Sequence, residues 1–561
     1  MLSRRDFVMA SLAAAALVGP ARLAPLAAQG RLTQEELLRF PAKGNVTLVH
    51  LTDIHAQLVP MYFREPSVNI GVGEAKGMVP HITGAAFLKT FGIPAGSAAA
   101  YALSDQDFSA LAKTYGRMGG LDRIATIVKA IRAERGDKVL LLDGGDTWTN
   151  SWVSLETKGQ DVVDAMNTLK PDAMTGHWEF TLGADRVKEL ADALSFPFLA
   201  QNIRETDFDD RVFEPHKMFS AGGISVAVIG QAFPFTPIAN PRWMFPKWSF
   251  GLRVEDIRKE VEAVRGKGAE IVVLLSHNGF DVDRKLSREV PGIDVILCGH
   301  THDAVPEATK VGNTLIISTG SHGKFVSRLD LDVAGGRVRD FSYRLIPIFS
   351  DAITSDPETK GVIEKHRAPY ASELGRVLGK TTDLLYRRGN FNGTLDDVFC
   401  DAMLAERDAE IALSPGIRWG TSILPGTDIT FEDITNGCAL SYPNCYRMTM
   451  SGARLKEVLE DVADNIFNPD PYYQQGGDMV RTGGLGFTID VAAPVGRRIS
   501  SMTLLKSGKE IEASKDYVVS GWASVGEDTQ GPPIWDVVSN YISKRKTIDV
   551  KRADTVKVIG A

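Results

Sequence analysis

The sequence predicts an α/β protein with two domains, on three observations. Short apolar runs such as KVLLLDGGD alternate with helical patterns such as GQDVVDAMNTLK over most of the first 320 residues, which is typical of buried strands covered by helices. The chain has 561 residues, too many for one ordinary hydrophobic core. Histidines and aspartates also follow several of the apolar runs, where a parallel sheet places its ligand site.

The predicted first domain, residues 31–350, contains strands and helices in alternation. The first strand-like run, NVTLVHLTDIH, leads into a long insert at residues 58–118 that we expect to be irregular. The elements that follow are, in order, the helix LDRIATIVKAIRAE, the strand KVLLLDGGD, the helix GQDVVDAMNTLK, PDAMTGHWE, the helix GADRVKELADAL, the strands FPFLAQNI and ISVAVIGQAF, the helix VEDIRKEVEAVRGKG, and the strands EIVVLLSHNG, IDVILCGHTHD and NTLIISTGSHG.

A polar helical stretch at residues 351–380 is predicted to connect this domain to a smaller α/β domain at residues 381–561. The second domain is expected to contain the helices LDDVFCDAMLAERD and GARLKEVLEDVADNIF and the strands EIALSP, GLGFTIDV and DYVVSGWAS.

Residues 1–30 have the pattern of an export signal. Arg4 and Arg5 precede a short apolar run, and small residues around Ala27 could form a cleavage site. The run is too short to span a bilayer as a mature helix. The arginine pair resembles a twin-arginine signal, so we expect a periplasmic protein without a membrane segment after signal removal. A disordered or membrane-anchoring terminus is the alternative.

Charge and cysteine content exclude some classes of protein. The net charge of −7 and the absence of a basic block do not favour nucleic-acid binding. Four cysteines are too few for a dense disulfide framework. Cys438 and Cys445 could form a disulfide or remain free thiols.

Five histidines and two aspartates follow the strand-like runs and are the candidate metal ligands. They are Asp53, His55, Asp146, His177, His277, His300 and His302. Because strand ends meet at one edge of an α/β sheet, residues spread over 250 positions can converge there. Each short motif is weak alone, since a GGD sequence is usually a turn. Their combination in order favours a site.

The candidate ligands suit two divalent ions. Imidazoles and carboxylates without cysteine favour Mn²⁺, Fe²⁺ or Zn²⁺ in a catalytic rather than a structural site. Seven protein ligands are too many for one ion that keeps an open position. Two ions sharing a bridging carboxylate would use them all.

The motifs LTDIHAQ, LLLDGGDTW, GHWEF, LLSHNGFDVD and IDVILCGHTHD resemble those of the dimetal calcineurin-like phosphoesterases of the 5′-nucleotidase family. DAEIALSPGIRWG, PGTDITFEDI and MTMSGARLKEVLED resemble that family's C-terminal domain. The resemblance implies a four-layer α/β/β/α catalytic domain and a second domain that holds the substrate. It assigns Asp53, His55, Asp146 and His302 to one metal, and Asp146, His177, His277 and His300 to the other, with Asp146 as the bridge.

One motif departs from the family pattern. The family reads Gly-Asn-His-Glu where this chain reads Gly176-His177-Trp178-Glu179. His177 can still bind a metal. Trp178 stands where the family's histidine assists the leaving group, and an indole cannot transfer a proton at physiological pH. A poor leaving group would therefore depart with difficulty, whereas a persulfide needs no such help.

This substitution, the export signal, the insert GEAKGMVPHITGAAFLKTFGI and the stretch YYQQGGDMVRTGG resemble the thiosulfohydrolases of bacterial sulfur oxidation. The resemblance implies release of sulfate from a cysteine S-thiosulfonate on the SoxYZ carrier, by a monomer with two ions, Mn²⁺ being favoured. The alternatives are a periplasmic 5′-nucleotidase or other phosphomonoesterase, and an exported metal-binding or carrier-docking protein without activity.

Candidate substrate contacts lie mainly in the second domain. Arg418 is expected to bind the sulfonate, since a guanidinium donates two hydrogen bonds to an oxyanion, although a loop arginine is often only a solvated surface group. Trp178 is also a candidate contact, Asp146 and His177 are catalytic candidates with Arg418, and Asn392 and His322 could support the site. A possible passage for the carrier arm, or an ordinary Gly-rich loop, is formed by Tyr472, Tyr473, Gly476 and Gly477.

Overall fold

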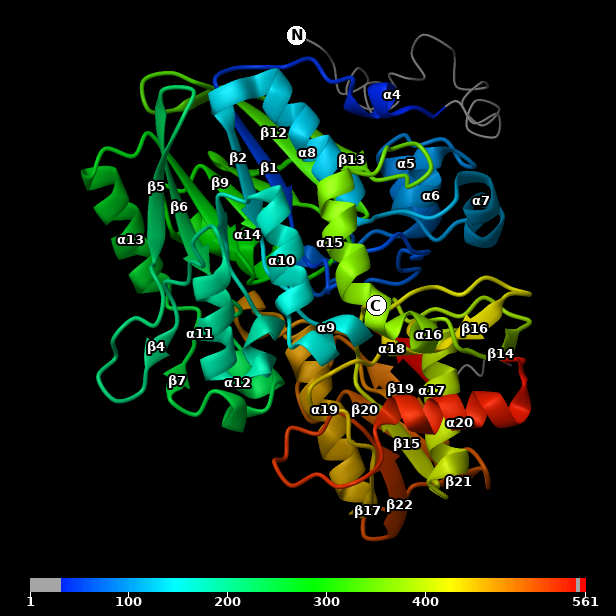
Figure 1. Ribbon diagram of the computed structural model, residues 1–561. Coiled ribbons are helices and arrows are strands. Elements are labelled where there is room, and N and C mark those ends of the chain that lie inside the picture. Colours follow the sequence, from blue (N-terminus) through cyan, green and yellow to red (C-terminus); the bar gives the residue numbers. More distant parts are fainter. Residues whose placement is uncertain (1–31, 551–554) are drawn as a thin grey trace. The chain divides into compact units, whose positions relative to one another are not determined.

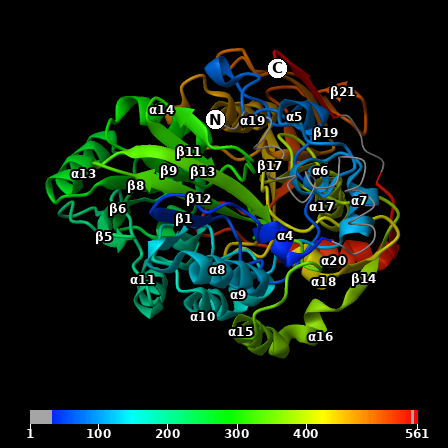
Figure 2. The same cartoon turned by 90° about the horizontal axis from the view of Figure 1, so that it is seen from above.

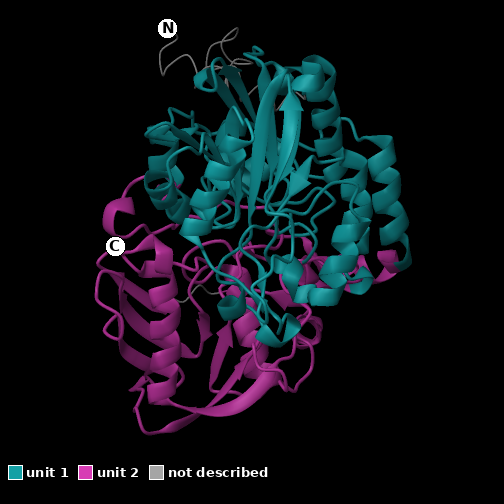
Figure 3. Ribbon diagram, turned by 90° about the vertical axis from the view of Figure 1, so that its left-hand side faces the viewer, with its two compact units in different colours: residues 1–62, 84–149, 156–369 teal, residues 63–83, 150–155, 370–561 magenta. Residues whose placement is uncertain are grey.

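The computed structural model describes residues 32–550 and 555–561, so the predicted export signal lies outside the described residues. The chain folds as two compact units (Figures 1 and 3). Among the described residues, unit 1 comprises residues 32–62, 84–149 and 156–369, and unit 2 comprises residues 63–83, 150–155, 370–550 and 555–561.

Unit 1 is built on two mixed sheets. The first sheet has the order β13 (Val338–Pro347), β12 (Phe325–Val333), β1 (Val46–Leu51), β2 (Val139–Asp143), β3 (Ala173–Met174). The second has the order β10 (Thr309–Val311), β11 (Thr314–Ser318), β9 (Val295–Cys298), β8 (Ile271–Ser276), β6 (Ile224–Gln231), β5 (His216–Ala221). In the first, β1, β2 and β3 run parallel and β12 pairs antiparallel with both β1 and β13. In the second, the four central strands are parallel and each edge strand is antiparallel to its neighbour.

Helices cover both sheets, which confirms the predicted four-layer α/β/β/α catalytic domain. Strands β1 and β8 are buried along their whole length, as continuous apolar runs require. On the first sheet α8 (Leu121–Arg135) packs against β2, and α10 (Gln160–Leu169) and α15 (Pro357–Arg367) pack on α8. On the second, α13 (Val254–Gly266) contacts β6 and β8, and α14 (Phe280–Glu289) contacts β9 and β11. Figure 2 shows α8 and α14 on opposite sides of the strands.

The expectation of an irregular insert at residues 58–118 is wrong. The region contains three short helices, α5 (Gly84–Thr90), α6 (Ala98–Leu103) and α7 (Phe108–Tyr115). They form because apolar side chains such as Phe87, Tyr101 and Phe108 are buried, and the Ser97 side chain caps α6 by accepting a hydrogen bond from the Ala100 N–H. Residues 63–83, by contrast, fold with unit 2.

Unit 2 is the predicted smaller α/β domain. One sheet has the order β17 (Tyr446–Ser451), β22 (Asp516–Gly521), β15 (Ile411–Ser414), β18 (Arg481–Gly483), and a second has the order β21 (Lys509–Glu510), β20 (Ile499–Leu504), β19 (Leu485–Asp490), β24 (Val556–Ile559). A third has the order β16 (Asp428–Thr430), β14 (Val377–Thr381), β23 (Thr547–Ile548). The longest helices are α17 (Thr394–Glu406), α19 (Gly452–Phe467) and α20 (Ile534–Arg545). Ile70 and Val72, from residues 63–83, pack against the core of this unit.

Two further findings concern thiols and membranes. Cys438 and Cys445 are free buried thiols, as are Cys298 and Cys400, which settles the alternative left open by the sequence. Within the described residues, every helix is too short or too polar to cross a bilayer.

Candidate metal centre

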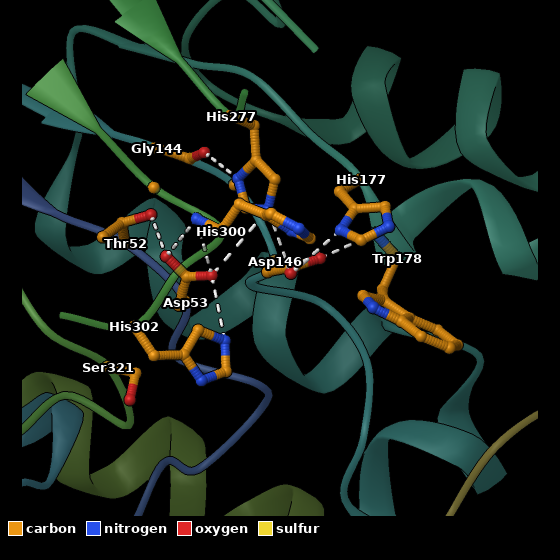
Figure 4. Close-up of polar contacts among 12 residues, drawn as sticks. Thr52, Asp53, Gly144, Asp146, His177, Trp178, His277, His300, His302 and Ser321 are labelled. Carbon is orange, nitrogen blue, oxygen red and sulfur yellow. Dashed lines mark hydrogen bonds and ion pairs between the residues drawn. The ribbon is translucent and has the colours of Figure 1, made fainter. Parts of the chain in front are cut away.

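All seven candidate metal ligands lie together in unit 1, where strands of the two sheets end. Figure 4 labels each of them except His55. Asp53 and His55 follow β1, Asp146 follows β2, and His277 follows β8. His300 and His302 follow β9, and His177 follows β3. All seven side chains are buried. The strand-end argument therefore placed these residues correctly in space, although they are up to 249 positions apart.

The first group consists of Asp53, His55, Asp146 and His302, whose candidate ligand atoms all lie within 4.8 Å of one another. Asp53 Oδ1 is 3.2 Å from His302 Nε2, and His55 Nε2 is 2.8 Å from His302 Nε2. Only one proton can lie between two facing imidazole nitrogens. A cation between them would instead use both lone pairs, so the donor arrangement fits a metal ion.

The second group consists of Asp146, His177, His277 and His300, within the same limit of 4.8 Å. Asp146 Oδ2 is 3.1 Å from His177 Nδ1 and 3.0 Å from His277 Nε2. His277 Nδ1 is 2.6 Å from the Gly144 carbonyl oxygen. A proton on Nδ1 would be donated to that carbonyl and would leave the Nε2 lone pair facing the group, which is the usual support of a metal-binding imidazole. Asp146 belongs to both groups and has the position of a bridging ligand.

Burial and mutual attraction shift the acidities of these residues. Burial raises the pKa of Asp53 to about 7. Burial would raise the pKa of Asp146 also, but His177 and His277 hold it well below its usual value. Burial lowers the pKa of His277, and the attraction of Asp146 and Asp53 outweighs this and raises it to about 10. The opposite shifts of Asp146 and His277 thus favour an ionised carboxylate beside a protonated imidazole. Protons therefore compete with a metal ion for the lone pairs of these side chains.

The backbone of the ligand loops is unusual. Five of the seven residues have a positive φ, between 51° and 74°: Asp53, His55, Asp146, His300 and His302. Non-glycine residues rarely adopt this left-handed conformation. Such strain gathers at functional sites, where the surrounding structure enforces it.

Glu179 of the GHWE motif holds two ligand loops together. Its Oε1 accepts hydrogen bonds from the Thr147 and Trp148 N–H groups, at 2.6 and 3.3 Å, and its Oε2 accepts one from the His177 N–H at 2.7 Å. A buried carboxylate saturated by backbone donors fixes the loop after Asp146 against the loop of His177. Sequence reasoning gave Glu179 no role, although a glutamate beside a candidate ligand was a usable signal.

Trp178 lies beside the second group. Its backbone N–H donates to Asp146 Oδ1 at 2.7 Å, and its ring centroid is 5.6 Å from that of His177. The side chain is half-buried and extends from the cluster next to His177 (Figure 4). The position that carries a histidine in the family pattern thus carries an indole at the edge of the metal centre.

Sequence reasoning also missed an aromatic contact of the second ligand group, made by Phe233. The Phe233 ring, which is fully buried, has its centroid 4.0 Å from that of His177 and 4.3 Å from that of His300. Phe233 follows β6, but an apolar side chain after an apolar strand gives no signal that separates it from ordinary core residues.

The predicted substrate contacts of the second domain belong to unit 2. Arg418 is buried, with 9% of its surface exposed, whereas Tyr473 is 66% exposed. Tyr472, Gly476 and Gly477 are half-buried. Asn392 donates to Asp397 Oδ1 at 3.0 Å and to the Thr482 carbonyl at 3.3 Å, so it stabilises the local fold of unit 2. Arg418 is therefore not the solvated surface arginine of the alternative interpretation.

Family models match both units of the chain. Residues 46–304 match the calcineurin-like phosphoesterase family, and residues 377–531 match the 5′-nucleotidase C-terminal domain. Among curated proteins, the 5′-nucleotidase of Bos taurus is 25% identical over 497 residues, which is 77% of this chain and 84% of that protein. The protein 5NUC of Lutzomyia longipalpis is 26% identical over 437 residues, or 69% of this chain and 74% of that protein.

Solved structures resemble the chain along almost its whole length. Sulfate thiohydrolase SoxB of Thermus thermophilus is 34% identical, with a TM-score of 0.90, and the match covers 93% of this chain and 98% of that one. A 5′-nucleotidase precursor of Thermus thermophilus shares the fold, with a TM-score of 0.73 at 20% identity and coverage of 92% and 100%. The chain is a hydrolase with a dimetal site that belongs to the calcineurin-like phosphoesterase family with a 5′-nucleotidase C-terminal domain, in the branch that contains SoxB.

Proposed function

We propose that this protein is a thiosulfohydrolase of the Sox sulfur-oxidation pathway. Its substrate is the S-thiosulfonate on the swinging-arm cysteine of the SoxYZ carrier, and its products are sulfate and the carrier persulfide. Water adds its oxygen to the terminal sulfonate sulfur, the bond between that sulfur and the neighbouring sulfane sulfur breaks, and the electron pair leaves with the persulfide. Two protons go to solvent.

The observation that carries the proposal is Trp178. It replaces the proton-donating histidine of the phosphoesterase pattern immediately beside His177, in a chain 34% identical to SoxB over 93% of its length. A nucleoside alkoxide leaves readily only when it is protonated, whereas a persulfide is a stabilised anion. Loss of the donor therefore disfavours phosphate esters more than thiosulfonates.

The other residues of the site have distinct proposed roles. Two divalent ions in such a site lower the pKa of bound water and polarise the oxyanion. Asp146 holds the two groups of ligands in one geometry, and Glu179 fixes the loops that carry Asp146 and His177. Arg418 is the proposed sulfonate contact from unit 2, with Tyr472, Tyr473, Gly476 and Gly477 as the proposed passage for the carrier arm.

Further parts of the proposal rest on ligand chemistry and on the N-terminal sequence. The oxygen and imidazole donors suit Mn²⁺ as the ion in both groups. The arginine pair at residues 4 and 5 supports export to the periplasm by the twin-arginine route, where the protein acts as a monomer.

The second candidate is a 5′-nucleotidase or another phosphomonoesterase, because several curated relatives are 5′-nucleotidases at 24–26% identity. The test compares AMP with SoxYZ carrying a cysteine S-thiosulfonate, using the Mn²⁺-loaded protein. Mass spectrometry of the carrier should show the sulfonate replaced by a persulfide, with an equal amount of sulfate released. Saturable turnover of AMP without any change in the carrier would establish the phosphatase instead.

A further inference from the structure

A sixth histidine, His322, lies against the first group of ligands. It is in the loop of residues 319–324 that joins β11 to β12, and none of its surface is exposed. Its ring centroid is 5.7 Å from that of His55 and 5.8 Å from that of His302. Neither group of candidate ligands includes His322. It therefore contacts two ligands of one metal without belonging to the ligand set.

The backbone of His322 is bound to the third ligand of the same group. Its N–H donates to the Asp53 carbonyl oxygen at 2.8 Å. Its φ of 58° is left-handed, like those of Asp53, His55 and His302. Non-glycine residues rarely adopt this conformation, so the surrounding structure must hold His322 in place.

Three contacts hold the loop of His322. The Ser321 Oγ lies 2.7 Å from His322 Nδ1 and fixes the ring. The buried Lys324 amino group donates to the Ala102 carbonyl at the end of α6, at 3.0 Å. Gly119 packs so closely that a Cβ there would lie 3.0 Å from the His322 carbonyl oxygen. The loop is thus anchored to the helical region on one side and to Asp53 on the other.

Phe233 provides the matching arrangement in the second group. Its phenyl ring contacts His177 and His300, with centroid distances of 4.0 and 4.3 Å. His55 and His302 thus both contact the ring of His322, and His177 and His300 both contact the ring of Phe233. The shared ring is a hydrogen-bonded imidazole in the first group and an apolar phenyl ring in the second.

We propose that His322 is the positioning residue of the first ligand group. Its ring sets the orientations of His55 and His302, and its backbone N–H fixes Asp53, so that a metal binds there with the geometry of the native site. The proposal requires the dimetal site but not the sulfur chemistry. Changes in such supporting residues typically alter metal affinity by about 10- to 100-fold.

The test measures Mn²⁺ binding to the metal-stripped full chain by calorimetry and electron paramagnetic resonance, without any substrate. The background His177→Ala leaves the first group as the intact site, and His302→Ala leaves the second. We expect His322→Ala to weaken Mn²⁺ binding at least tenfold in the first background and less than twofold in the second. Phe233→Ala is the matched control. We expect it to weaken Mn²⁺ binding in the His302→Ala background and to have little effect in the His177→Ala background.

The hydrogen bond to the ring is tested separately. His322→Phe keeps a ring but loses the contact with Ser321, and we expect an intermediate loss of affinity at the first group. If circular dichroism shows that His322→Ala does not fold, the Ser321→Ala variant takes its place in the test. We then expect the Mn²⁺ affinity of the first group to fall by about threefold and that of the second group to stay unchanged. Unchanged affinity in the folded variants, or equal losses in both backgrounds, would overturn the proposal. Because only metal is measured, failure of the thiosulfohydrolase assay leaves this result interpretable.

Discussion

The two ligand groups share Asp146 but differ in their donors. The first group adds a second carboxylate, Asp53, to two imidazoles, whereas the second adds three imidazoles to the shared carboxylate. Carboxylate oxygens favour harder ions such as Mn²⁺, and imidazole nitrogens also suit Zn²⁺. The difference teaches that one bridging carboxylate can join two ligand groups that differ in charge and in donor type, and this comparison can be tested at four levels.

The largest effect should come from removal of the shared ligand. Asp146→Asn removes the charge that both groups use, so we expect loss of both ions and a fall in hydrolysis of about a thousandfold, because metal ions supply several kcal/mol of stabilisation to the transition state. Metal analysis and carrier assays measure this. Asp164→Asn, a change at a side chain that pairs with His366 on α15, is the control. Retention of one tightly bound ion in Asp146→Asn would show that the groups are independent.

The second effect concerns the edge of the second group. Trp178→His restores a proton donor beside His177, and we expect AMP hydrolysis to rise by about a hundredfold, within the usual range for general-acid catalysis. Trp178→Phe is the control, since it keeps a ring but supplies no proton. If both variants hydrolyse AMP no better than the native protein, Trp178 acts through packing alone.

The third effect concerns a buried carboxyl behind the second group. Asp283 Oδ1 accepts hydrogen bonds from Ser276 Oγ and Asn278 Nδ2 at 2.8 and 3.0 Å, on either side of His277. Burial raises the pKa of Asp283 from 3.8 to about 6, although these hydrogen bonds oppose the shift. The folded protein therefore holds this proton more tightly than the unfolded chain. The resulting stabilisation is complete below pH 3.8 and is lost as the pH rises through 6.

Asp283→Asn removes that pH dependence and keeps an acceptor for both donors. Relative to the native protein, the metal-free variant should gain on the order of 2 kcal/mol in free energy of unfolding between pH 4 and pH 8. Denaturant unfolding at several pH values measures the difference. A constant difference between variant and native protein would mean that Asp283 does not titrate with folding.

The smallest effect is a difference in metal preference. In His302→Ala, which leaves the second group intact, we expect Zn²⁺ to compete with Mn²⁺ about tenfold better than in His177→Ala, which leaves the first. Competition titrations followed by elemental analysis measure the ratio. Equal ratios would show that donor type does not distinguish the two groups.

The sequence predicted that the seven candidate ligands lie close together, because strand order alone brings strand ends together. Asp53 and His302 are 249 positions apart, yet each lies in the loop that follows a buried strand. The supporting contacts could not be predicted in this way. Phe233 looks like any core residue, and the contact of His322 with His55 depends on a left-handed loop that no periodic pattern indicates.

The insert shows a second limit of sequence reasoning. Residues 63–83 interrupt unit 1 and fold with unit 2, where the Ile70 N–H donates to Asn390 Oδ1 at 2.5 Å. The two residues are 320 positions apart, and local composition carries no information about such a partner. The helices of residues 84–115 were missed because each is only six to eight residues long, too short for a helical period to stand out.

The left-handed residues around the metal centre also bear on how this protein can change over evolutionary time. A replacement at His55 or His300 must supply a metal donor and also tolerate a positive φ, which excludes most amino acids. Asparagine and aspartate tolerate that conformation best among residues with donor side chains. Mutational paths to a different metal should therefore pass through asparagine or aspartate at these two positions more often than through cysteine or glutamate.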